Sequence, residues 1–154
     1  MSRGVRQVAR KLASLSLTDW VELVQAQAAL IAAQALVWTR PVGQLLDGAR
    51  PAAPPRRATL AEGNPAAPRL ARAVSRAATH GIFRPLCLVR AVALQRMLER
   101  RGIAGSRIRI GVRRNGTDLA AHAWVEYGPQ VLGDTVEHVG TFAHLADVQL
   151  VDRL

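Results

Sequence analysis

One cysteine, one histidine and one aspartate follow each other in the order that a cysteine nucleophile with two helpers would need. Cys87 is the only cysteine of the chain and stands at the start of an amphipathic segment. His122 and Asp134 follow on two segments with strand-like alternation. A thiolate attacks acyl carbons, an imidazole moves the proton, and a carboxylate fixes the tautomer of the imidazole. This ordered set predicts acyl-transfer chemistry with Cys87, His122 and Asp134 as catalytic residues.

The spacing of His122 and Asp134 predicts how these two side chains meet. Each lies six residues from Gly128, which opens a Gly-Pro turn. If the turn is centred on Gly128, the two residues stand opposite each other on antiparallel strands, with Cβ atoms about 5 Å apart. A turn centre shifted by one residue would place the side chains on opposite faces. We therefore expect an imidazole–carboxylate contact across this hairpin.

The position of Cys87 near a helix start suits a nucleophile. Periodicity predicts a helix over residues 85–101, with Pro85 in its first turn and Gly102 closing it. The positive end of the helix dipole and the free N–H groups of the first turn favour a thiolate. The same N–H groups could stabilise an oxyanion.

Each of these residues also has an ordinary structural interpretation. A single cysteine at a helix start is often a small buried hydrophobe, a lone strand histidine is often structural, and aspartate after glycine is common in turns. Trp124 shares the face of His122 and is expected to wall the site, while Glu126 on that face is an alternative partner for the imidazole. The three remaining histidines are expected to have no comparable geometry; they are His80, His138 and His144.

The elements that must position these residues change period along the chain. Helical spacing covers residues 20–38, where Asp19 and Glu22 suggest a capping box, and continues at 70–78 and 85–101. Alternation then predicts strands at 108–112, 119–127 and 131–134, with an Asn-Gly turn at 115–116; the tail 142–150 is ambiguous. We therefore predict an α+β fold in which a small antiparallel sheet packs on the cysteine-bearing helix. Its expected parts are an N-terminal helical region (1–46), a Pro/Ala/Arg-rich linker or loop (47–68) and a core (69–154).

Composition limits the classes of protein. A single cysteine excludes an intramolecular disulfide and a multi-cysteine zinc site. Neither a signal peptide nor a membrane span is expected, so a cytoplasmic protein is the default. The net charge of +10 comes from arginine, with Lys11 as the only lysine. Such a field attracts nucleic acid, acidic peptides or anionic lipid, but it also fits arginines on solvated faces.

Several blocks of the sequence resemble the lasso-peptide leader peptidases, which are transglutaminase-like cysteine proteases. The resemblance covers residues 70–150 well and residues 19–39 more loosely. The blocks that carry it are Cys87-Leu88-Val89-Arg90-Ala91-Val92-Ala93-Leu94, Leu98, Arg101-Gly102-Ile103, Ile110-Gly111-Val112, Ala121-His122-Ala123-Trp124-Val125-Glu126 and Leu132-Gly133-Asp134.

The resemblance implies a transglutaminase/papain-like core and a peptidase that removes the leader from a ribosomally made precursor. By motif, Cys87 is the nucleophile, His122 the general base and acid, and Asp134 the residue that orients the imidazole. Some members of the family carry a fused leader-recognition domain; at 154 residues this chain resembles the stand-alone form, so a separate leader-recognition protein and a lasso cyclase are expected as partners, with no cofactor and no metal for this chain. We also expect Trp124, Arg107 and Arg109 to contact the substrate, and some of the basic surface to meet an acidic leader or the recognition protein.

Two other functions remain open from the sequence. The same triad could transfer the acyl group to an amine, as transglutaminases do. Alternatively, the arginines at 69–76 and 107–114 could make a non-catalytic module that binds nucleic acid or peptide. Aromatic residues for base stacking are nearly absent from these segments, which counts against single-strand binding. No nucleic-acid partner is therefore expected.

Overall fold

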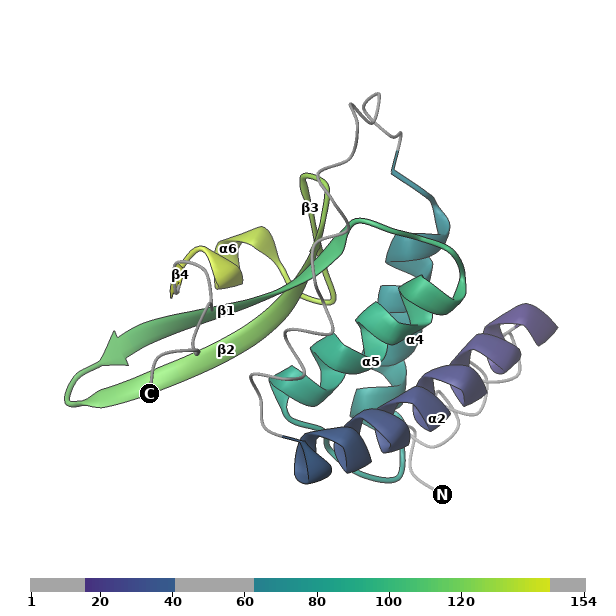
Figure 1. The fold of residues 1–154 in the computed structure, drawn as a ribbon, viewed down its shortest axis with the longest axis horizontal. Helices are drawn as coiled ribbons and strands as arrows, with labels where there is room; N and C mark the ends of the chain where they lie inside the picture. The colour runs from purple at the N-terminus through teal and green to yellow at the C-terminus, as the bar shows by residue number, and fades with distance from the viewer. Residues whose placement is uncertain (1–15, 41–62, 145–154) are drawn as a thin grey trace, which may run out of the picture.

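The fold is described from a computed structural model, in which residues 16–40 and 63–144 are placed. Three helices pack together beside a four-stranded antiparallel sheet (Figure 1). This confirms the predicted α+β class. Most of the predicted linker at 47–68 and the end of the tail at 145–150 lie outside the described residues.

Helix α5 (Cys87–Arg100) is the centre of the packing. It contacts α2 (Leu17–Thr39) and α4 (Ala66–His80), and it also contacts the first two strands of the sheet. Leu30, Leu70 and Leu98, one from each helix, are fully buried in this core. Many of the other core residues are alanines, so the three helices approach closely. The predicted third helix is thereby confirmed, although it begins at Cys87 and Pro85 lies outside it.

Helix α2 begins one turn earlier than the predicted capping box. Ser16 is the N-cap: Asp19 N–H donates to Ser16 Oγ (3.2 Å), and Ser16 N–H donates to Asp19 Oδ2 (3.0 Å). The prediction that Asp19 and Glu22 form the box was wrong because Glu22 is drawn into the core. Its side chain is 3% exposed, and its carboxylate pairs with Arg69 (2.9 Å) where α2 meets α4.

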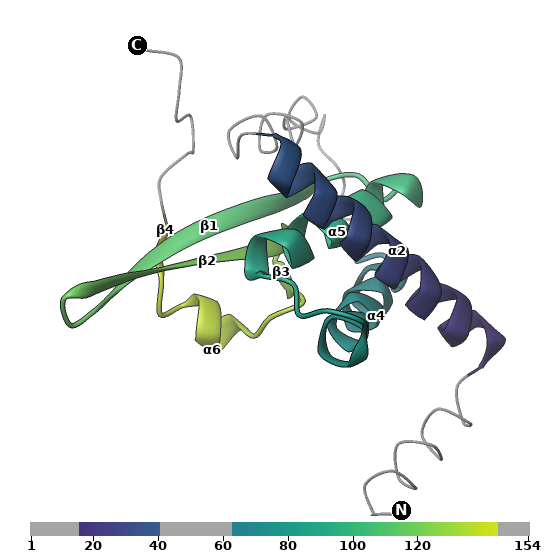
Figure 2. The same ribbon diagram turned by 90° about the horizontal axis from the view of Figure 1, so that it is seen from below.

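Helix α2 is apolar on two faces. Ala26, Leu30 and Ala33 are buried against the other helices. The opposite face carries exposed apolar side chains along its whole length; these are Leu17, Trp20, Val21, Val24, Ile31 and Trp38. The helix is long and apolar enough to cross a membrane by length and composition alone. In the fold, its inner face is a packing surface for α4 and α5 (Figure 2).

The sheet is built on one long hairpin that extends beyond the helices (Figures 1 and 2). Strands β1 (Ser106–Asn115) and β2 (Asp118–Tyr127) pair along their full length, with Asn115 opposite Asp118, which confirms the predicted Asn-Gly turn. The short strands β3 (Gln130–Leu132) and β4 (Ala143–His144) flank them in the order β3-β2-β1-β4. A short helix, α6 (Val136–Val139), links β3 to β4.

The two faces of β2 serve different clusters. Ala123 and Val125 join the main core with α5, whereas Trp124 packs with Val139 and Phe142 on the α6 side. Strand alternation places His122 on the Trp124 face. The sheet therefore separates the helical core from a smaller cluster that holds the histidine.

Candidate active site

Cys87 is the first residue of α5 and lines a pocket between this helix and strand β2. The N-cap residue is Leu86, whose side chain cannot accept a hydrogen bond, whereas α2 and α6 are capped by the hydroxyls of Ser16 and Thr135. Arg90 N–H makes the first helical bond, to Leu86 O (3.1 Å). Among the residues that the structure describes, no side chain accepts a hydrogen bond from the N–H groups of the first turn of α5. Cys87 thus sits beside free backbone donors, as its position in the sequence predicted.

His122 lies on β2 just beyond the end of the β3 pairing. Strand β3 pairs only with residues 125–127 of β2, and on the other side Gly111 of β1 faces His122. The edge of β2 next to His122 is therefore not covered by β3. This gap leaves room for the chain after β3 to reach the imidazole, and the pocket there is also lined by Cys87 at the start of α5.

Asp134 reaches His122 by a route that differs from the predicted one. Val125 pairs with Leu132, so the turn is centred between Gly128 and Pro129 rather than on Gly128. Continued in that register, Asp134 would lie opposite Ala123, and the predicted cross-strand pairing is wrong. Strand β3 instead stops at Leu132, and Gly133, with φ +78°, turns the chain. Asp134 Oδ2 then lies 2.5 Å from His122 Nε2.

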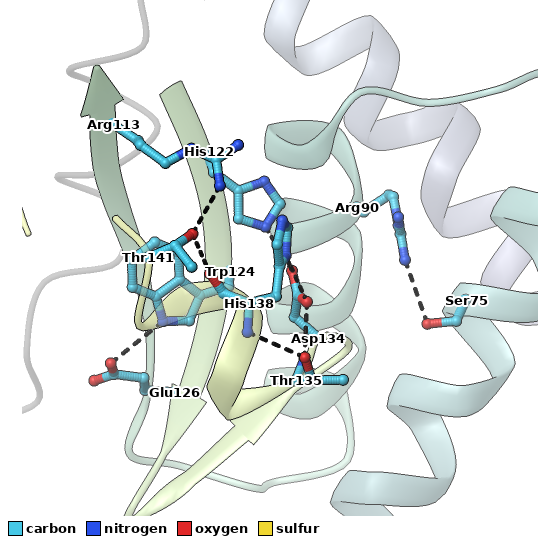
Figure 3. Close-up of polar contacts among 10 residues, drawn as sticks. All are labelled: Ser75, Arg90, Arg113, His122, Trp124, Glu126, Asp134, Thr135, His138 and Thr141. Carbon is cyan, nitrogen blue, oxygen red and sulfur yellow. Dashed lines mark hydrogen bonds and ion pairs between the residues drawn. The ribbon is translucent and has the colours of Figure 1, made fainter. Parts of the chain in front are cut away.

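Three donors converge on the Asp134 carboxylate (Figure 3). Besides the imidazole of His122, Thr135 N–H donates to Oδ1 (2.8 Å), and His138 Nδ1 lies 2.9 Å from Oδ1. Burial alone would raise the pKa of this carboxyl, but the hydrogen bonds from His122, Thr135 and His138 outweigh it, and the pKa lies below its usual value. Asp134 is therefore held as a carboxylate. Such a carboxylate takes the N–H of Nε2 and leaves His122 Nδ1 as the free base.

His138 is a member of this cluster that the sequence interpretation missed. It was expected to have no comparable geometry, but its ring contacts that of His122 edge-on, with centroids 4.8 Å apart. Thr135 caps α6 by accepting the N–H of His138, which sets the histidine one turn after Asp134. The spacing Asp134-Thr135-x-x-His138 was the available signal, because residues four apart share a helix face.

Aromatic rings wall the other side of His122. Trp124 is 2% exposed, and the ring of Phe142 lies 5.1 Å from that of His122, centroid to centroid. Trp124 Nε1–H donates to Glu126 Oε1 (3.3 Å), and Glu126 also pairs with Arg109 (2.9 Å). Glu126 is thus engaged elsewhere, so the alternative of Glu126 as the imidazole partner is wrong.

A pocket brings the predicted catalytic residues together. Cys87, His122 and Asp134 all line it, and Trp124 forms part of its wall. The residues that the sequence did not single out include Ser75 from α4 and Arg90 from α5. Arg107 and Arg109 were predicted to contact substrate but are not among the lining residues; Arg107 is exposed and Arg109 is held by Glu126.

The cluster of His122, Asp134 and His138 has the composition of a metal site. One ligand atom from each residue lies within 4.8 Å of the others, and imidazole nitrogens with a carboxylate are ligands that zinc accepts. The three side chains are already joined by hydrogen bonds through the carboxylate. These bonds account for the clustering without an ion.

The chain belongs to the transglutaminase-like superfamily. The family model matches residues 28–147, which include Cys87, His122 and Asp134. Members of this superfamily are generally cysteine peptidases or acyl transferases. No curated protein and no solved structure matches the chain.

Proposed function

We propose that this protein is a cysteine peptidase that removes the leader from a ribosomally synthesised lasso-peptide precursor. The observation that carries the proposal is that Cys87 and the His122–Asp134 pair line the same pocket. The resemblance of the blocks around Cys87 and His122 to lasso-peptide leader peptidases gives the substrate class. Assignment to the transglutaminase-like superfamily supports the chemistry.

The proposed reaction passes through a thioester. The Cys87 thiolate attacks the carbonyl carbon of the scissile peptide bond, and first-turn N–H groups of α5 stabilise the oxyanion that forms. His122, protonated, gives its proton to the leaving amine as the C–N bond breaks. Water then attacks the thioester while His122 takes a proton from it, and the C–S bond breaks, which releases the carboxylic acid and regenerates the thiolate beside the protonated imidazole. Asp134 orients the imidazole and stabilises its charged form throughout.

The partners in this proposal are separate proteins. A leader-recognition protein would present the precursor, and a lasso cyclase would close the macrolactam on the freed core peptide. This chain itself would need no cofactor and would act in the cytoplasm. Its division into an N-terminal helical region, a linker and a peptidase core belongs to the same proposal.

The first test measures the reactivity of the thiol. Alkylation of Cys87 by iodoacetamide is followed as a function of pH in the wild type, in His122→Ala and in the control His80→Ala, whose histidine is exposed at the end of α4. We expect a reactivity midpoint well below the ordinary value of about 8.5 in the wild type and the control, and a higher midpoint in His122→Ala. An ordinary midpoint in all three proteins would contradict a thiolate–imidazole pair.

The second test identifies the product. A precursor peptide is incubated with the protein and its recognition partner, with Cys87→Ala as the control, and the products are analysed by mass spectrometry. Leader and core peptides with newly formed carboxyl and amino ends, absent from the control, support hydrolysis. A cross-linked product formed with an added amine would instead support transglutaminase-like acyl transfer, and RNA binding that survives Cys87→Ala without any cleavage would favour a binding module.

A further inference from the structure

The pocket at Cys87 contains a charged group that the proposed hydrolysis does not use. Arg90 lies three residues after Cys87 on α5 and lines the same pocket. Residues three apart on a helix are neighbours, with Cβ atoms about 5–6 Å apart. Arg90 therefore shares the pocket with Cys87, and its guanidinium points toward Ser75 of α4.

Arg90 has no acidic partner within the described residues. The one hydrogen bond that its side chain makes there is from Nη2 to the hydroxyl of Ser75 on α4, at 3.5 Å (Figure 3). The arginines that make ion pairs in the same part of the chain each contact a glutamate; they are Arg69, Arg101 and Arg109. Arg90 is half-buried, so its charge is only partly satisfied by solvent. A partly desolvated guanidinium with one long neutral contact is available to an anionic ligand.

The other charges that line the pocket do not compensate for Arg90. The one carboxylate there is Asp134, and it is engaged by the two imidazoles and by Thr135 N–H. The pocket thus combines a nucleophile, an engaged carboxylate and a free guanidinium. This arrangement is complementary to an acyl substrate that carries a negative charge near its reacting carbonyl.

We propose that Arg90 forms a carboxylate-binding subsite beside Cys87, so that the substrate carries a carboxylate close to the carbonyl carbon that the thiol attacks. The proposal rests on the proposed role of Cys87 as the nucleophile. The guanidinium would accept the carboxylate through charge-assisted hydrogen bonds, with the Ser75 hydroxyl holding the side chain against α4. An acidic side chain next to the scissile bond and a free terminal carboxylate would supply the same chemistry.

The test compares two alkylating probes of nearly equal shape. Iodoacetate carries a carboxylate where iodoacetamide carries an amide, and both react with the same thiolate. Their rate ratio at Cys87, divided by the ratio for N-acetylcysteine amide, is therefore independent of the fraction of thiolate. We expect the wild type to favour iodoacetate by about fivefold on this scale, which corresponds to ~1 kcal/mol, the size of a partly exposed charged contact.

Variants of two arginines on the same helix decide the outcome. Arg90→Gln should bring the normalised ratio to about one, while Arg90→Lys, which keeps the charge without the fork, should retain part of the preference. Arg96→Gln makes the same change of net charge at an exposed position outside the pocket and should leave the ratio as in the wild type. A wild-type ratio near one, or a preference that persists in Arg90→Gln, would overturn the proposal.

Two further pairs of matched probes identify the source of the carboxylate. The chloromethyl ketones of N-acetyl-aspartate and N-acetyl-asparagine test an acidic side chain, and iodoacetylglycine and its amide test a terminal carboxylate. An Arg90-dependent preference within either pair supports the subsite and names its source, and no preference in either pair counts against it. The proposed peptidase function is tested separately, because the dependence of iodoacetamide alkylation on His122 does not involve these ratios.

Discussion

Replacing Gly111 with alanine is a sharp test of how the wall behind His122 is packed. Gly111 faces His122 across the β1–β2 ladder. A Cβ atom at this position would lie 2.7 Å from Phe142 Cβ and 2.9 Å from Trp124 Cη2. Neither neighbour can retreat easily, because Phe142 and Trp124 are both buried. The glycine is therefore required by the close approach of the two aromatic residues.

Two effects of opposite sign determine the magnitude. The backbone of Gly111 does not adopt a positive φ, so alanine would ordinarily stabilise the strand by about 0.4–1 kcal/mol by restricting the unfolded chain. Overpacking of a tight core costs about 1–3 kcal/mol. We expect the packing effect to win, with a net loss of roughly 1–2 kcal/mol in the free energy of unfolding. The displaced rings should also shift His122 and slow the alkylation of Cys87 at neutral pH.

Urea denaturation of Gly111→Ala and of a control measures the loss. The control is Gly63→Ala, whose new Cβ would meet only the end of the Gln130 side chain, which can move. We expect the control to lie within about 0.5 kcal/mol of the wild type. In a double-mutant cycle, replacing the indole with the smaller ring of Trp124→Phe should reduce the stability that Gly111→Ala costs. A Gly111→Ala protein as stable as the wild type would refute this account of the packing.

Four further substitutions, in three tests, probe the carboxylates of the fold. Because folding lowers the pKa of Asp134, its contribution to stability is present above the unfolded pKa of about 3.9 and is lost as pH falls through the folded pKa. In urea titrations, the free energies of unfolding of Asp134→Asn and of the wild type should therefore converge below about pH 4. A difference that stays constant with pH would contradict this linkage. His138→Gln should raise the pKa of Asp134 toward its usual value and move the acid limb of the pH profile of Cys87 alkylation to higher pH. The loss in the free energy of unfolding should be only about 1 kcal/mol. If His138 is purely structural, the alkylation profile should stay in place. In thermal or urea unfolding, Arg69→Gln should cost about 2 kcal/mol, because it leaves the Glu22 side chain, which is 3% exposed, without its closest charged partner. Glu22→Gln should cost less than about 1 kcal/mol, because the Arg69 side chain that it leaves unpaired is 46% exposed. Equal costs would contradict the burial of the Glu22 charge.

The elements were predictable where local pattern and chemistry agree. The change from helical to strand period located α5 and the β1–β2 hairpin, and the Asn-Gly turn fixed the pairing of Asn115 with Asp118. Helix starts were less predictable. At Asp19 and Glu22 the sequence contains a capping pattern, but burial of Glu22 beside Arg69 decides its role, and a tertiary contact of this kind has no local signal.

The sequence predicted which residues lie together but not how they meet. Residue type and order were enough to select Cys87, His122 and Asp134, which line one pocket. The expected pairing across the hairpin failed because the turn centre, which depends on Gly128 and Pro129 together, is shifted by half a residue. Arg90 lies in the segment from Cys87 to Leu94 that carries the resemblance. Its place in the pocket, however, depends on the packing of α4 against α5, which has no local sequence signal.

The shift in register explains why the chain after β3 is built as it is. Continued as a strand, residue 134 would face away from His122, so the contact requires the chain to leave the ladder, and Gly133 provides that turn. Once outside the sheet, Asp134 has lost strand neighbours, and its direction is set instead by Thr135 N–H and by His138 at the end of one helical turn. Orientation of the imidazole therefore depends on residues 133–142 rather than on sheet pairing. Substitutions in α6 should consequently change the reactivity of Cys87 more than they change the stability of the fold.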